Sequence, residues 1–157
     1  MSREEFDRAL ANVLGVVSRV DPNDPEAASK LALELPADGP ALSELRKLVR
    51  RGVEERWLAD RENAGVRYSR VKKAQSADEL SVDCVNMSVP GPGHAHPNGE
   101  IDLCFAVSGE PRFDGKAPGW TVYPAGSWHV PTVTGGEMDI LYFLPGGAIQ
   151  FGPKPAG

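Results

Sequence analysis

The stretch GPGHAHPNGEIDLCFAVSG, residues 91–109, guides the interpretation of the whole chain. It holds two of the chain's three histidines, and the third, His129, follows in YPAGSWH. Side chains on an extended segment alternate between two faces, so His94 and His96 point to the same side. Glu100 has the same parity and follows a PNG turn. The sequence therefore predicts that these side chains converge on one point.

Imidazole and carboxylate groups in this arrangement indicate a metal site. Two or three imidazoles with one carboxylate suit a divalent transition metal, whereas Ca²⁺ prefers oxygen ligands alone. His129 would join the other groups from a neighbouring strand. We therefore predict one divalent ion, with Fe(II) or Mn favoured and Zn or Ni also compatible. The predicted ligands are His94, His96, Glu100 and His129.

The sequence after residue 64 is typical of an all-β domain. Short runs rich in β-branched and aromatic residues alternate with Gly, Pro, Asn and Asp turns, and no helical stretch separates them. This pattern predicts a sandwich or a small barrel. The expected strands cover residues 65–73, 80–89, 100–107, 111–113, 120–123, 128–133, 137–144 and 148–151.

The first part of the chain has the periodicity of amphipathic helices instead. Apolar residues recur at intervals of three and four between residues 6 and 20. A second helix is expected to begin with Asp24 as its N-cap and to end at Pro36. A third helix follows DGP, with an apolar stripe over residues 42–57 and a solvated face that carries its charges. We therefore expect about three helices ahead of the strands.

Composition and charge argue against some kinds of binding partner. The net charge is -5, and no Lys or Arg tract is long enough to follow phosphates, so nucleic acid and membrane surfaces are not expected partners. No run approaches the roughly 18 apolar residues of a membrane span, and no secretory segment is evident. We expect a cytoplasmic protein in which Cys84 and Cys104 are buried thiols.

The change from helical to β-strand patterns divides the chain. The expected parts are a helical segment at 1–63, a β-barrel at 64–152 and a tail at 153–157.

Two segments resemble the sequence motifs of the cupins. HAHPNGE supplies His94, His96 and Glu100 at the spacing of the first cupin motif. PAGSWH, residues 124–129, matches the PxGxxH part of the second motif. The resemblance covers residues 66–151 and implies a mainly β fold, the cupin-type double-stranded β-helix or jelly-roll barrel, with the metal inside.

Two features depart from the cupin pattern. The asparagine that often follows the second-motif histidine is Val133 here. Gly109 lies nine positions after Glu100, further than the first motif expects, and counting back from it nominates Asp102 as the acidic ligand. Both acids share a strand face, and we favour Glu100 because the tight turn sets its distance from the histidines. Asp102 is then expected to accept a hydrogen bond from a ligand or to transfer protons.

The layout of the chain is similar to that of one family of small bacterial cupins. The helical segment, the single barrel and the GEIDLCF segment resemble the family that contains 4-hydroxylaminobenzoate lyase. The resemblance implies a metal-dependent lyase that forms protocatechuate and ammonia, with Glu100 and Asp102 as catalytic groups. The alternatives are a mononuclear iron dioxygenase and a non-catalytic, metal-dependent cupin that binds small molecules.

A carboxylated aromatic substrate needs a cationic anchor and an aromatic wall. Arg suits the anchor because it binds carboxylates through two parallel hydrogen bonds. Spacing does not choose among the candidates for either role. The candidate anchors are Arg67, Arg70, Lys72 and Arg112, and the candidate wall residues are Tyr68, Tyr123, Trp128 and Tyr142. Because cupins often dimerise, the resemblance also leaves a homodimer open.

Overall fold

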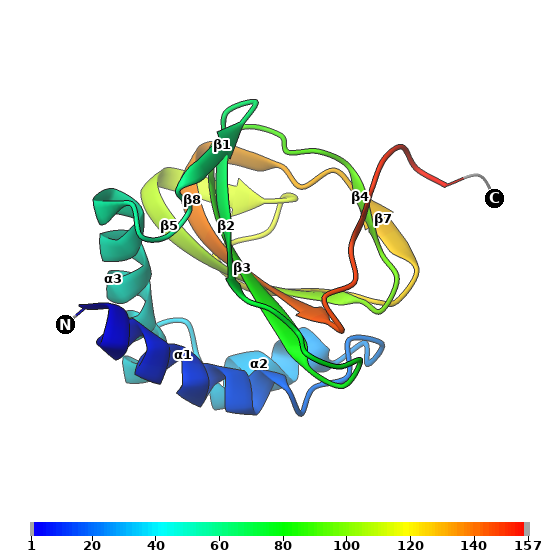
Figure 1. The fold of residues 1–157 in the computed structure, drawn as a ribbon, viewed down its shortest axis with the longest axis horizontal. Coiled ribbons are helices and arrows are strands. Elements are labelled where there is room, and N and C mark those ends of the chain that lie inside the picture. The colour runs from blue at the N-terminus through cyan, green and yellow to red at the C-terminus, as the bar shows by residue number, and fades with distance from the viewer. Residues whose placement is uncertain (1, 156–157) are drawn as a thin grey trace.

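A computed structural model describes residues 2–155 of the chain. Within this range three helices precede nine strands (Figure 1). The helices are α1 Ser2–Val17, α2 Ala27–Glu34 and α3 Pro40–Glu55. The strands are β1 Arg61–Asn63, β2 Val66–Lys72, β3 Leu80–Met87, β4 His94–His96, β5 Glu100–Phe113, β6 Gly119–Tyr123, β7 Ser127–His129, β8 Val133–Pro145 and β9 Gln150–Phe151.

The strands form two antiparallel sheets that face each other across the barrel interior. The larger sheet has six strands in the order β1-β2-β3-β8-β5-β6, and the smaller has three in the order β7-β4-β9. β8 pairs with both β3 and β5, which are distant from it in sequence, as in a jelly roll and unlike a simple meander. The predicted fold class, a mainly β jelly-roll barrel preceded by helices, is confirmed.

β5 continues through residues 108–110, where the sequence predicted a turn between two strands. Its pairing with β8 shifts register on both sides of this segment. A strand can continue through such β-bulges because each adds a residue without ending the ladder. Gly109 has a φ of 74°, and a Cβ atom on it would lie 2.5 Å from the Gly135 backbone oxygen. The number of residues between Glu100 and Gly109 includes a bulge, which adds a residue to the strand. The spacing from Gly109 is therefore a poor guide to the acidic ligand.

Other element boundaries also differ from the sequence prediction. The run expected at 128–133 is divided between the end of β7 and the start of β8. α2 begins at Ala27, and the Asp24 carboxylate accepts a hydrogen bond from the Glu26 amide at 2.9 Å in the turn before it. Asp24 is therefore part of the preceding turn and not the N-cap of the helix.

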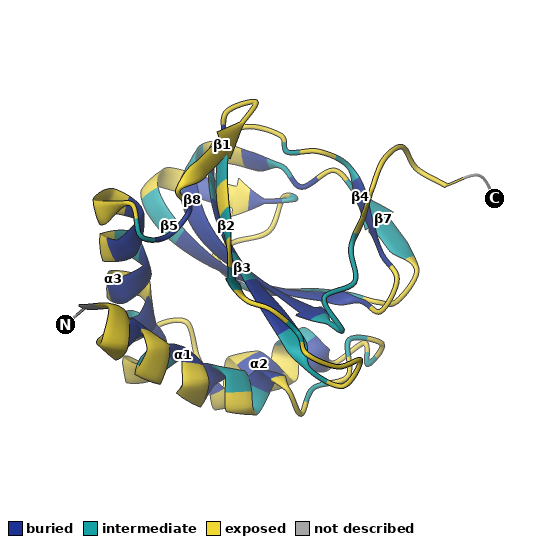
Figure 2. Ribbon diagram, viewed as in Figure 1, coloured by how far each residue is buried: buried dark blue, intermediate teal, exposed yellow. Residues whose placement is uncertain are grey.

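The three helices cover the outer face of the six-stranded sheet (Figure 1). Figure 2 shows their buried sides turned toward the sheet. Successive side chains of a strand point to opposite faces. Ile101, Leu103 and Phe105 of β5 therefore join the core formed with the helices, whereas Glu100 and Asp102 face the barrel interior. Both faces of this part of the sheet are covered, which explains the continuous burial of residues 100–105 at the start of β5.

Cys84 and Cys104 are free and buried. Cys84 packs in the core beneath the helices, whereas Cys104 lies in the core on the barrel side of the sheet. The prediction of two buried thiols is confirmed. Among the described helices, none combines the length and apolar character that a membrane crossing requires.

The packing of α3 against the sheet predicts a large cost for shortening a core side chain. Leu45 of α3 is fully buried. We expect Leu45→Ala to lower the free energy of unfolding by about 2–5 kcal/mol, because it removes buried methyl groups and leaves a cavity. Leu33→Ala is the matched control on α2, since Leu33 is 84% exposed, and it should change stability by about 0.5 kcal/mol or less. Equal losses in urea titrations of the two variants would contradict this packing.

Candidate metal centre

The structure brings together the four side chains that the sequence predicted as ligands. His94 and His96 lie on β4, and Glu100 is the first residue of β5. β7 pairs with β4 so that His129 lies opposite His94. Each side chain offers one ligand atom, and these atoms lie within 4.8 Å of one another. His94, His96 and Glu100 are almost fully buried, and the His129 side chain is 10% exposed. The cluster lies inside the barrel where the two sheets meet.

The Glu100 carboxylate is the centre of this cluster. Its Oε1 atom lies 3.0 Å from His94 Nε2 and 3.3 Å from His96 Nε2. Its Oε2 atom lies 3.4 Å from His129 Nε2. The Nε2 atoms of His94 and His129 are themselves 3.1 Å apart. All three imidazoles therefore direct the same ring nitrogen inward.

The outer ring nitrogens of the histidines are each held by a hydrogen bond. The partners of Nδ1 are the Pro92 carbonyl for His94 at 3.2 Å, the Ser127 hydroxyl for His96 at 2.9 Å and the Asp114 carboxylate for His129 at 2.6 Å. A carbonyl and a carboxylate only accept, and the Ser127 hydroxyl already donates to the Pro124 carbonyl at 2.6 Å. Nδ1 of each histidine is therefore the donor. In the neutral imidazoles this leaves an Nε2 lone pair that points inward.

The inner atoms of the cluster fit a divalent transition metal. His96 Nε2 and Glu100 Oε2 are buried and have no hydrogen-bond partner among the described residues. Buried polar atoms are normally paired, because an unpaired one loses its interaction with water and gains nothing. A cation among the three nitrogens and the carboxylate would satisfy these atoms together. Three imidazoles suit a transition metal better than Ca²⁺ or Mg²⁺.

The pKa values of the two buried acids on β5 are shifted in opposite directions. Burial favours the neutral form of a carboxyl group. At Glu100, the surrounding imidazoles of His129, His94 and His96 outweigh this effect and hold the pKa well below its usual range. At Asp102, burial and the negative charge of Glu100 raise the pKa well above its usual value. The surroundings therefore favour the charged form of Glu100 and the neutral form of Asp102, which lies next to it on the same strand face.

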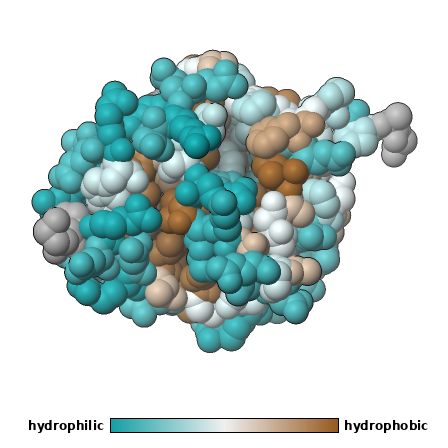
Figure 3. All heavy atoms as spheres, in the orientation of Figure 1, coloured by the Kyte–Doolittle hydropathy of each residue, from teal (hydrophilic) through white to brown (hydrophobic). Residues whose placement is uncertain are grey.

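A pocket of about 1030 Å³ opens beside His94. Aromatic side chains line it near the cluster, with the Tyr142 ring centroid 6.3 Å and the Phe151 ring centroid 5.7 Å from that of His94. Figure 3 shows apolar atoms around β4 and β9 next to hydrophilic atoms of β1 and β2. The pocket therefore offers an apolar wall at the cluster and a polar wall opposite.

Of the four cationic anchors predicted from the sequence, only Arg70 lines this pocket. Arg67 lies on the other face of β2 and donates to two backbone carbonyls, at 3.1 and 2.9 Å. Lys72 pairs with Glu79 at 3.7 Å. Arg112 donates to a carbonyl of its own turn at 3.4 Å. The structure thus separates candidates that the sequence left equal.

Arg61 and Lys73 also line the pocket, and the sequence analysis missed both. Arg61 is paired with Tyr68 across β1 and β2, so it shares the inner face with Tyr68 and Arg70. Asp83 binds Arg70 through two hydrogen bonds. The side chains of Arg61 and Lys73 have no ion pair or hydrogen-bond partner among residues 2–155. Because Arg61 precedes the first strand expected from the sequence, no register was available to place it.

The four predicted wall residues lie in three different places. Tyr68 and Tyr142 line the pocket. Tyr123 packs between two of the histidines, with its ring centroid 5.3 Å from His96 and 4.4 Å from His129. The Trp128 indole lies away from the pocket lining and donates to a backbone carbonyl at 3.0 Å.

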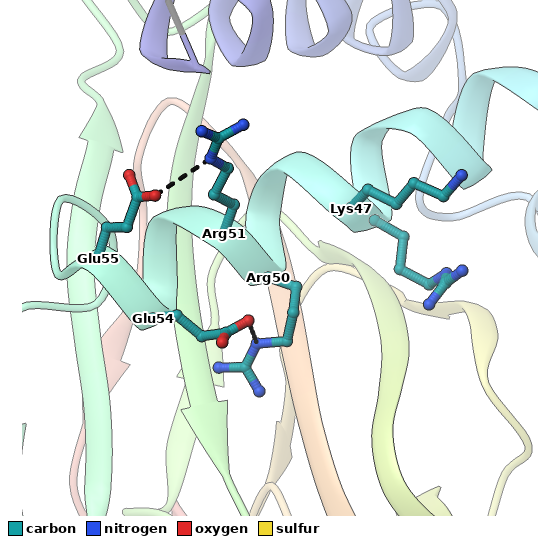
Figure 4. Close-up of a pocket in the computed structure, with 6 residues that line it drawn as sticks. Lys47, Arg50, Arg51, Glu54 and Glu55 are labelled. Carbon is teal, nitrogen blue, oxygen red and sulfur yellow. Dashed lines mark hydrogen bonds and ion pairs between the residues drawn. The ribbon is translucent and has the colours of Figure 1, made fainter.

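A second, smaller hollow of about 340 Å³ lies on the outer face of α3, far in sequence from the histidines. Figure 4 shows Arg50 and Arg51 directed toward Glu54 and Glu55 of the same helix. These i,i+4 pairs have separations of 3.7 and 3.1 Å. The charge run of α3 is mostly the exposed face that the sequence predicted, but Arg50 is partly buried and pairs with Glu137 and Asp139 of β8. No member of the histidine cluster lines the hollow.

These features define the class of protein. A jelly-roll barrel whose HxH pair, glutamate and third histidine meet inside it is a cupin. Its fold is similar to the crystal structure of the DMSP lyase DddQ from Ruegeria pomeroyi DSS-3, with a TM-score of 0.56 at 18% identity. The likeness covers 98% of this chain and 99% of that one, so it includes the helices as well as the barrel.

The sequence comparisons are more specific than the fold. The family profile described as PnbB: 4-hydroxylaminobenzoate lyase matches residues 9–151. The chain is 33% identical to a 4-hydroxylaminobenzoate lyase of Nocardioides sp. (strain LMS-CY), over 69% of this chain and 70% of that protein. It is 28% identical to a protein of the same name from Pseudomonas putida, over 73% and 76% of the two chains. The chain belongs to the 4-hydroxylaminobenzoate lyase family.

Proposed function

We propose that this protein is a metal-dependent lyase that converts 4-hydroxylaminobenzoate, or a close carboxylated relative, to protocatechuate and ammonia. The observation that carries the proposal is the cluster of three imidazoles and a carboxylate at one end of an aromatic pocket with cations at the other. The names of the two relatives support the choice of substrate. The reaction balances if one water is consumed for each ammonia released.

One divalent ion, Fe(II) or Mn, is proposed as the cofactor, with Glu100 and the three histidines as its ligands. The inward lone pairs and the unpaired buried atoms His96 Nε2 and Glu100 Oε2 support this assignment. When bound, the ion supplies Lewis acidity, which weakens an N–O bond and favours its cleavage. Asp102 lies outside the set of converging atoms, which supports Glu100 as the acidic ligand.

The pocket residues are proposed to orient the substrate ring. Arg70, Asp83 and Tyr142 face one another in turn across β2, β3 and β8. Adjacent strands are about 4.8 Å apart, so the backbone of Arg70 lies roughly 10 Å from that of Tyr142. The long Arg70 side chain can extend across this distance toward the Tyr142 ring. A carboxylate bound by Arg70 and Arg61 would direct the opposite end of a para-substituted ring toward His94.

Asp102 is proposed as the proton-transfer group. It continues the same row, since it faces Tyr142 on the inner side of the sheet. Its carboxyl group is completely buried beside Glu100, and burial raises its pKa well above the usual value, which favours the neutral form. Loss of oxygen from a hydroxylamino group requires a proton, and a neutral carboxyl group shielded from bulk water is suited to deliver one.

The ligand assignment is tested by metal retention. Alanine in place of any of the three histidines should lower affinity for the ion about tenfold or more, because one of four donors is lost. Glu100→Gln should have a similar effect, because a neutral amide replaces the charged carboxylate. Asp102→Asn is the matched control, because it changes a buried acid on the same strand face and should keep the metal while losing turnover. Elemental analysis after dialysis against a chelator measures the result.

Full metal content in all three histidine variants would contradict the site. Metal loss in Asp102→Asn together with retention in Glu100→Gln would instead identify Asp102 as the acidic ligand.

The reaction is tested under nitrogen. The oxidising equivalent of the hydroxylamine oxygen is consumed in hydroxylating the ring, so no O₂, nicotinamide or flavin is required. The metal-loaded protein should therefore convert 4-hydroxylaminobenzoate anaerobically and release one ammonia for each protocatechuate formed. Strict dependence on O₂ would overturn the lyase in favour of a dioxygenase. Tight binding of the substrate without ammonia release would identify a binding protein instead.

The anchor is tested by substrate affinity. We expect Arg61→Gln and Arg70→Gln each to raise KM about tenfold or more with a smaller effect on kcat, because each removes a charged hydrogen bond to the carboxylate. Arg112→Gln is the matched control, since Arg112 does not line the pocket, and its KM should be unchanged. An analogue without the ring carboxylate should react poorly with the wild type and be insensitive to both pocket substitutions. Equal KM values for all three variants would reject this anchor.

A further inference from the structure

Asp114 is the hub of a hydrogen-bond network behind His129. Its Oδ2 atom accepts from His129 Nδ1 at 2.6 Å and from the Tyr123 hydroxyl. Its Oδ1 atom accepts from the Thr132 amide at 2.9 Å, and its own amide donates to the Thr132 carbonyl at 2.8 Å. Asp114 has a φ of 51°, a left-handed conformation that Asp tolerates better than most residues. Both carboxylate oxygens are thus fixed by donors from three different segments.

The link to Asp114 sets His129 apart from the other two histidines. Pro92 and Ser127, the outer partners of His94 and His96, are neutral acceptors, at 3.2 and 2.9 Å. Hydrogen bonds to an ionised acceptor are shorter and about twice as strong as neutral ones. His129 is also the most exposed member of the cluster and belongs to an edge strand of the smaller sheet, whereas His94 and His96 lie on its central strand. Its imidazole therefore depends most on a contact outside the strand.

Tyr123 connects this network to a second histidine. Its ring stacks on His96 at an interplanar angle of 30° and lies against His129 at an angle of 45°. The Lys116 ammonium lies 5.1 Å from the Tyr123 ring centroid. The hydrogen bond from the Tyr123 hydroxyl to Asp114 prevents the Tyr123 ring from turning away from the histidines. Asp114 and Tyr123 together therefore fix the spacing of two of the three imidazoles.

We propose that Asp114 is a positioning residue that holds His129 with Nε2 directed at Glu100, and that Tyr123 locks Asp114 in place. The inference rests on the metal-binding function proposed above. Asp114 acts through His129 and does not itself reach the converging ligand atoms. A carboxylate on the outer nitrogen also makes an imidazole a stronger donor to a metal.

Cobalt(II) binding tests the proposal, because its d–d absorption reports ligand geometry. Asp114→Asn should lower the Co²⁺ affinity about 10- to 100-fold and alter the d–d spectrum, since an amide donates where the carboxylate accepts. Tyr123→Phe keeps the ring and should give a smaller change in the same direction. Glu110→Gln is the matched control, because Glu110 is an exposed acid on β5, and it should match the wild type. Wild-type affinity and spectrum in both test variants would overturn the proposal.

Nuclear magnetic resonance of the metal-free protein separates this inference from the proposed function. The His129 Nδ1 proton should be shifted downfield and protected from exchange in the wild type, and this signal should be lost or moved in Asp114→Asn. If the wild type bound no divalent ion, the metal-dependent function would fail, yet this signal would still decide the role of Asp114. An Nδ1 proton signal that is the same in both proteins would overturn it.

Discussion

The buried Glu100 carboxylate and the three imidazole nitrogens around it are the constraint on which the site depends. Burial of an ionised carboxylate costs several kcal/mol of hydration free energy unless other groups replace the water molecules around it. Here Nε2 atoms at 3.0 to 3.4 Å surround it. Those nitrogens face inward only because each Nδ1 has an acceptor on its outer side. The backbone at Pro92, the Ser127 hydroxyl and the Asp114 carboxylate therefore hold the three imidazoles in the orientation that the proposed metal site requires.

The rest of the barrel keeps this cluster in register. A slip of one residue in β5 would exchange Glu100 and Asp102 for Ile101 and Leu103 on the inner face. The helices oppose such a slip because Ile101, Leu103 and Phe105 of β5 are packed into the core beneath them. Arg50 of α3 adds a polar restraint on the neighbouring β8, with its Nε atom 3.4 Å from the buried Asp139 carboxylate. The N-terminal helices thus contribute to the site without supplying any of its residues.

Local rules predicted the part of the site that local geometry determines. His94, His96 and Glu100 could be grouped from strand parity and a tight turn, and His129 was recognised from a second motif. Asp114 could not be found in this way, because its contacts with Tyr123, His129 and Thr132 depend on how three separate segments fold together. The extent of β5 could not be predicted for the same reason. A bulge forms only against its partner strand, and in the sequence alone it looks like a turn.

The two sheets contribute unequally to the site. The histidines come from the three-stranded sheet, whereas Glu100, Asp102 and the pocket cations come from the six-stranded sheet and its edge. An ion held by all four ligands would therefore join the two sheets, and its binding energy would stabilise the closed barrel by mass action. Arg70 and Asp102, the proposed anchor and the proposed proton-transfer group, share one row of the larger sheet, so the separation of their backbones is set by strand spacing. Substrate position relative to the histidines then depends on how the smaller sheet is held, and Asp114 controls its least buried histidine.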